Sequence, residues 1–89
     1  MTNAEIANTI LTEQYKLAGL TIEQAKALKN EEFDKFRLTP EIHLKWYVWA
    51  VQFVKKQRKS WPVIKCKKEV GMLDFQHGLN IQYDWTSRT

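Results

Sequence analysis

The chain is poor in several residue types that small proteins often depend on: of its 89 residues, one is cysteine, two are histidine, two are proline and three are glycine. A single cysteine excludes an internal disulfide framework and a zinc site with several cysteine ligands, and it favours a reduced compartment. The glycines stand alone at positions 19, 71 and 78, so the sequence contains no glycine-rich phosphate-binding loop.

Long apolar runs are also missing. The most apolar stretch covers about thirteen residues and contains His43, Lys45 and Gln52, whereas a membrane-spanning helix needs about 20 apolar residues. The first residues, Met1–Glu5, have neither the basic region nor the apolar region of a secretory signal. From these absences we expect a cytoplasmic protein that does not enter membranes.

Aromatic residues, in contrast, are abundant: four Trp, four Phe and three Tyr. Each buries about 150–250 Å² when it packs, which helps a chain of this size to form an adequate core. The hydrophobic fraction of 44% and the charged fraction of 27% are those of an ordinary globular protein. The length predicts a single domain over residues 1–89.

Charge is distributed unevenly along the chain. Five basic and seven acidic residues precede position 45, whereas nine basic and three acidic residues follow, so the net charge of +4 arises in the second half. Such an excess attracts polyanions or an acidic protein surface, although it also suits a solvated face that keeps a small protein soluble. Seven bases fall within fourteen residues that contain no acid: Lys55, Lys56, Arg58, Lys59, Lys65, Lys67 and Lys68.

Hydrophobic periodicity and capping residues predict two helices in the first part of the chain. Apolar residues recur at three- and four-residue steps before Gly19, which predicts a helix over about 4–18 that ends at this glycine. Thr21 and Gln24 have the spacing of a capping box, and apolar residues follow them at helical steps. We therefore expect a second helix over about 22–37.

The third predicted helix is the longest. Thr39 is suited to cap it, Pro40 to occupy its first position and Glu41 to interact with the positive end of its dipole. Apolar residues then cover more than half of its circumference, so we expect several neighbouring elements to pack against it. Pro62 disfavours helical geometry before it, which predicts a helix over about 40–59.

After Pro62 the periodicity becomes that of β-strands. Leu73 and Phe75 alternate with a polar residue in a predicted strand over 71–75, and a loop at 76–78 would pair it with a strand over 79–85 in an antiparallel hairpin. Residues 63–68 are a candidate third strand, although their lysines also suit a turn or an exposed edge. We thus predict an α+β fold with three helices and a C-terminal hairpin. The alternating apolar residues of the last strand are Leu79, Ile81, Tyr83 and Trp85.

Few side chains are suited to catalysis. His43 lies on the apolar face of the third helix, where we expect a hydrogen bond to a neighbouring carbonyl or hydroxyl, and Glu41 points to another face. His77 falls in the predicted hairpin loop. Cys66 lies between two lysines that favour its reactive thiolate form, but no histidine is adjacent to activate it. The sequence therefore predicts a non-enzymatic protein without a metal or a cofactor.

The basic segment provides the leading functional hypothesis. Basic side chains neutralise phosphates irrespective of nucleotide sequence, and an exposed tryptophan among them can stack on an unpaired base. We therefore predict a small regulatory protein that associates with nucleic acid. Its expected contacts are Lys55, Lys56, Arg58, Lys59, Trp61, Lys65, Lys67 and Lys68.

Two other interpretations are open at this point. A protein-binding modulator, such as an adaptor or an inhibitor, would dock an aromatic patch with a basic rim on an acidic partner through Trp61 and Trp85, and self-association is a variant of this. A winged helix that reads DNA also has three helices and a hairpin. However, the third helix here carries Trp46, Tyr47 and Trp49 where a recognition helix presents polar side chains to base edges.

Overall fold

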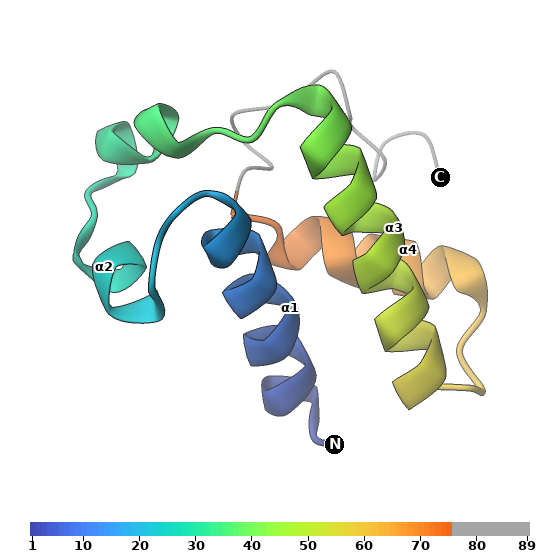
Figure 1. Cartoon of the computed structure of the whole chain (residues 1–89). Helices are drawn as coiled ribbons and strands as arrows, with labels where there is room; N and C mark the ends of the chain where they lie inside the picture. The colour runs from blue at the N-terminus through green and yellow to red at the C-terminus, as the bar shows by residue number, and fades with distance from the viewer. Residues whose placement is uncertain (76–89) are drawn as a thin grey trace.

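The computed structural model describes residues 1–75, and these residues form helices joined by short connections (Figure 1). Helices α1, α3 and α4 pack together, whereas α2 and η1 form an arm that leads from α1 to α3. No β-strand occurs in this part of the chain. The elements in chain order are α1 (Asn3–Leu17), α2 (Ile22–Ala27), the 3₁₀ helix η1 (Asn30–Phe36), α3 (Pro40–Gln57) and α4 (Val63–Leu73).

The prediction of an α+β fold is therefore wrong for the described residues. The candidate strand at 63–68 lies inside helix α4. The candidate strand at 71–75 covers the last three residues of α4 and the two residues that follow it. Cys66 and Val70 lie four residues apart on one face of that helix and are fully buried, while the lysines that suggested an exposed edge lie on its other faces. The strand predicted at 79–85, with its loop, lies outside the described residues.

The starts of the helices follow local capping chemistry. The hydroxyl of Thr21 accepts a hydrogen bond from the Gln24 amide at 3.1 Å, and the Gln24 side chain accepts one from the Thr21 amide at 2.9 Å. Thr39 caps α3, as the sequence predicts. Thr2 forms a second capping box with Glu5 at the start of α1. These bonds satisfy backbone N–H groups that have no partner inside the helix.

The helix predicted over 22–37 is interrupted in its middle. α2 ends at its sixth residue, and the next two residues are extended, with ψ angles of 142° and 158°. The carboxylate of Glu32 accepts a hydrogen bond from the Lys29 amide at 3.0 Å, and this local bond competes with continuation of the helix. The break also brings the ring of Phe33 to 5.4 Å from that of Phe75, measured between centroids.

The core forms where α3 contacts both α1 and α4. Trp46, the largest fully buried side chain, donates its indole N–H to the carbonyl of Ile10 at 2.9 Å, which links α3 to α1. Contact with two helices explains why apolar residues cover so much of the α3 circumference. The buried cluster consists of Ile6, Ile10, Trp46, Tyr47, Ala50, Val54, Cys66 and Val70.

Helix α3 is 18 residues long, but its outer face is partly polar. Lys45, Gln52 and Lys56 are exposed along it, at spacings that place them on one side of the helix. Among residues 1–75, accordingly, no helix combines the length and the apolar character that crossing a bilayer requires.

Candidate functional site

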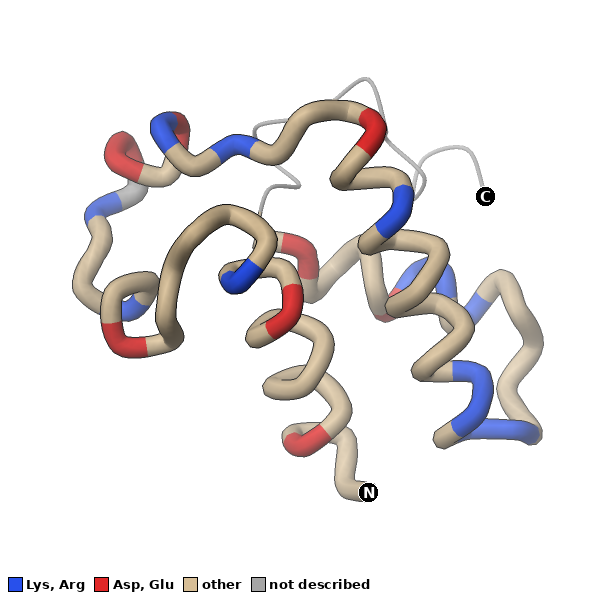
Figure 2. Tube along the Cα trace, viewed as in Figure 1, with Lys and Arg blue, Asp and Glu red and all other residues tan. Residues whose placement is uncertain are grey.

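The seven predicted basic residues surround the corner where α3 ends and α4 begins. Figure 2 shows Lys and Arg positions gathered in the last turn of α3, the connecting loop and α4, whereas basic and acidic positions are mixed along the arm. Within residues 1–75, none of the seven pairs with a carboxylate. We call this region the basic corner, and its exposed side chains are Lys56, Lys59, Lys65 and Lys68.

Two of the seven bases have contacts that hold the fold together, and a third is half-buried. The ammonium of Lys55 donates hydrogen bonds to two backbone carbonyls of the connecting loop. Arg58 donates to the carbonyl of Met1 at 2.9 Å and to the side-chain oxygen of Asn3 at 2.6 Å, so it fastens the start of α1 to the corner. Lys67 is half-buried and lines a groove between α3 and α4. The four exposed lysines are therefore the ones best placed to contact a ligand.

Trp61 lies within the basic corner, but its ring is not fully exposed. Its side chain is half-buried and packs against the core. The ammonium of Lys65 lies 4.2 Å from the centroid of the ring, and the guanidinium carbon of Arg58 lies 5.8 Å from it. Both distances are within the range of cation–π attraction. Trp85, the other predicted interface tryptophan, lies outside the described residues.

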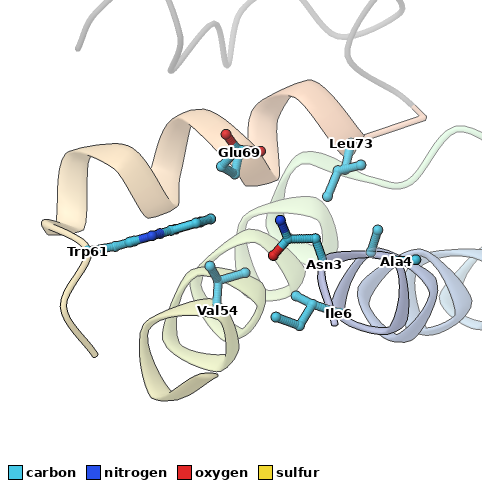
Figure 3. Close-up of a pocket in the computed structure, with 8 residues that line it drawn as sticks. Asn3, Ala4, Ile6, Val54, Trp61, Glu69 and Leu73 are labelled. Atoms are coloured by element: carbon cyan, nitrogen blue, oxygen red, sulfur yellow. The ribbon is translucent and has the colours of Figure 1, made fainter. Parts of the chain in front are cut away.

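A cavity of about 290 Å³ adjoins Trp61, between the start of α1 and the basic corner (Figure 3). Ile6 of α1, Val54 of α3 and Leu73 of α4 contribute much of its apolar wall. Two polar side chains also line it, Asn3 and Glu69. Sequence reasoning missed this cavity because its walls come from three helices that are distant along the chain.

A separate cluster of polar side chains lies in the interior. His43 Nε2 is 2.7 Å from Asp74 Oδ2, Gln14 Nε2 donates to Asp74 Oδ1, and the amide of Phe75 donates to Gln14 Oε1 at 3.2 Å. The exposed fraction is 1% for His43, 4% for Asp74 and zero for Gln14, so a substrate has no access to them. The cluster connects α1 and α3 to the end of α4, which is a structural role.

The partner of His43 differs from the expected one. The sequence predicts a hydrogen bond to a carbonyl or a hydroxyl, whereas the structure shows a carboxylate 31 positions away in the chain. Cys66 is fully buried in the core, so its thiol is closed to reagents. Among the residues that the structure describes, no three His, Cys, Asp or Glu side chains are grouped closely enough to hold a metal ion.

No family model matches the chain, and comparisons with curated proteins and with solved structures give no match either. Function is therefore inferred from the charge, the cavity and the exposed surfaces described above.

Proposed function

We propose that this chain is a small, non-enzymatic regulatory protein that binds the phosphate backbone of nucleic acid through its basic corner. The observation that carries the proposal is the gathering of four exposed lysines around the end of α3 and the first half of α4 (Figure 2), with no carboxylate paired to any of them within residues 1–75. Each lysine that neutralises a phosphate releases a counterion, which favours binding irrespective of nucleotide sequence. The four side chains are Lys56, Lys59, Lys65 and Lys68.

The position of Lys65 in its helix, in contrast to that of Lys56, supports a role beyond helix stability. Lys56 lies in the last turn of α3, where the negative end of the helix dipole already favours a cation. Lys65 lies in the first turn of α4, where that dipole disfavours a cation, and this turn contains no acidic residue. An anionic ligand would compensate this unfavourable placement.

Titration of fluorescently labelled DNA over about 50 to 200 mM salt tests the proposal. About four phosphate contacts predict a slope near −3 to −4 when the logarithm of the binding constant for duplex DNA is plotted against that of salt concentration. Replacing Lys56, Lys59, Lys65 and Lys68 together by Ala should abolish most of this binding.

A control variant loses the same amount of positive charge at positions outside the basic corner. It replaces four exposed lysines of α1 and the arm by Ala and should retain most of the affinity: Lys16, Lys26, Lys29 and Lys35. Absence of binding at low salt, or equal losses in the two quadruple variants, would show that the basic corner is not a phosphate-binding site.

Exposed apolar side chains favour a second function, that of a protein-binding modulator. Ile64 is 52% exposed and Met72 is 71% exposed, and they flank Lys68 at four-residue steps on the outer face of α4. Val48 of α3 is 46% exposed. Apolar side chains interleaved with lysine suit an interface with an acidic partner.

A photo-crosslinking residue at Met72 tests this alternative. It should give a protein adduct that the same residue at Ala27, which is exposed on α2, does not give. Equal adducts at both positions, or none at either, would count against a specific interface on α4. Sedimentation over a range of protein concentrations distinguishes a self-associating variant of this function.

A further inference from the structure

We infer that the cavity beside Trp61 receives a single unpaired nucleobase, so that the protein binds single strands in preference to duplexes. This inference rests on the proposed binding of nucleic acid and adds the form of nucleic acid that is bound. The cavity adjoins the basic corner through Trp61, which belongs to both.

The size of the cavity suits one base. Its volume of about 290 Å³ lies at the lower end of the range of about 300–1,000 Å³ for small-molecule sites. A single heterocyclic ring system fits such a space, whereas a base pair does not. A base inside a duplex must first leave its stack, which costs a few kcal/mol, while an unpaired base enters without that cost.

The walls provide the contacts that a planar heterocycle requires. Ile6, Val54 and Leu73 present apolar surface to the ring, and Trp61 closes one end of the cavity (Figure 3). Aromatic rings attract each other in offset and edge-to-face arrangements, and a base–aromatic contact contributes about 1–3 kcal/mol. An inserted base would therefore be held mainly by its faces and edges, independently of the phosphates.

Two polar side chains on the wall are suited to the polar edge of a base. The carboxylate of Glu69 only accepts hydrogen bonds when ionised, and the Asn3 side chain has an NH₂ group that donates. The oxygen of Asn3 is engaged by Arg58, which orients this amide. The Watson–Crick edges of adenine, cytosine and thymine each have a hydrogen-bond donor beside an acceptor, so each can use such a pair. We thus expect the cavity to accept these bases without a strong preference among them.

Lys65 connects the cavity to the phosphate-binding surface. Its side chain is exposed, and its ammonium lies 4.2 Å from the centroid of the Trp61 ring. The phosphate of a nucleotide whose base enters beside Trp61 therefore approaches a positive charge. The exposed Lys59, in the loop before Trp61, is placed to contact the next phosphate.

The experiment measures the affinities of labelled oligonucleotides of about 12 nucleotides by fluorescence anisotropy. The probes are oligo(dA), oligo(dC), oligo(dT) and a duplex of mixed sequence. The three oligonucleotides should each bind about tenfold more tightly than the duplex, which corresponds to about 1.4 kcal/mol.

Two variants locate the effect in the cavity. Ala7→Phe fills the cavity from α1 without altering the basic corner, and it should reduce the affinity for the oligonucleotides to that for the duplex. Ala27→Phe, at an exposed position of α2, is the matched control and should leave the preference for single strands unchanged. Circular dichroism verifies that each variant is folded.

The outcomes separate the two proposals. If oligonucleotides and duplex bind equally and Ala7→Phe does not change this, the base-binding inference is wrong, while phosphate binding by the basic corner stands. If no probe binds at low salt, both proposals are wrong.

Discussion

At the scale of single residues, the Asp74 carboxylate makes the most consequential polar contacts in the described chain. It accepts a hydrogen bond from Gln14 and pairs with His43, and all three side chains are buried. A buried donor that loses its acceptor remains unsatisfied, because water does not reach it. Asp74 therefore joins three helices through bonds that solvent cannot replace.

Asp74→Ala should lower the free energy of unfolding by about 2–4 kcal/mol, because it leaves the partners of the carboxylate without their acceptor. Asp34→Ala is the matched control. Asp34 pairs with Arg37 at 2.8 Å but is 66% exposed, so its loss should cost less than about 1 kcal/mol. Chemical denaturation monitored by tryptophan fluorescence compares the two, and similar losses would contradict the role given to Asp74.

Tyr47 makes the stability of the folded state depend on pH in the alkaline range. Burial raises the pKa of Tyr47 from 10.0 to about 12, because the interior disfavours the phenolate. The neutral phenol therefore stabilises the folded state at pH values below about 10, and this contribution is lost as pH rises towards 12. Thermal denaturation between those pH values should show a steeper loss of stability in the wild type than in Tyr47→Phe. Parallel curves would mean that Tyr47 is not the group responsible.

At the scale of elements, short-range bonds determine where the helices begin and end. α1 ends in a Schellman motif, in which the amide of Leu20 donates to the carbonyl of Tyr15 at 2.8 Å and that of Gly19 donates to Lys16 at 3.0 Å. Gly19 has a φ of +82°, a conformation that other L-residues rarely adopt. The reversal after α1 thus depends on one glycine.

Gly19→Ala should destabilise the protein by about 1–2 kcal/mol through backbone strain alone, because no atom lies within 4 Å of the added Cβ. Gly19→Asn should cost less, since asparagine tolerates this conformation better. Melting temperatures should therefore decrease in the order Gly, Asn, Ala. An alanine variant as stable as the wild type would show that the turn relaxes to another conformation.

At the scale of the whole molecule, hydrogen bonds connect α1 to the other helices near its start, its middle and its end. Arg58 holds its first residues, Trp46 bonds to Ile10 near its middle, and Gln14 bonds to Asp74 near its end. The middle and end contacts are buried, whereas the Arg58 contact is exposed. Exposed bonds open more readily than buried ones, so the start of α1 is its least stable part.

Arg58→Ala should accelerate amide hydrogen exchange in the first two turns of α1 at least about fivefold and leave exchange in α3 nearly unchanged. The reason is that the Arg58 side chain donates to Met1 and Asn3, whereas towards the core it lies over the half-buried ring of Trp61 and not over a fully buried residue. The global free energy of unfolding should fall by less than about 1.5 kcal/mol. Uniform acceleration throughout the protein would instead indicate that Arg58 supports the entire fold.

The sequence was a good guide to features that depend on neighbouring residues. The starts of α2 and α3 follow from Thr21 and Thr39, whose hydroxyls cap helices a few positions away. The gathering of bases around Trp61 follows from their proximity in the chain. The sequence does not predict the break between α2 and η1, because helical periodicity continues through it while a local bond at Lys29 ends the helix.

Features that join distant segments could be known only from the folded chain. The period-two pattern after Pro62 favoured strands, but the burial of Cys66 and Val70 against α3 stabilises a helix there, and a short pattern cannot reveal which burial surface is available. In the same way, the pairing of His43 with Asp74 and the cavity beside Trp61 arise from contacts between helices. Residue spacing specifies which side chains share a face, whereas tertiary packing decides what each face meets.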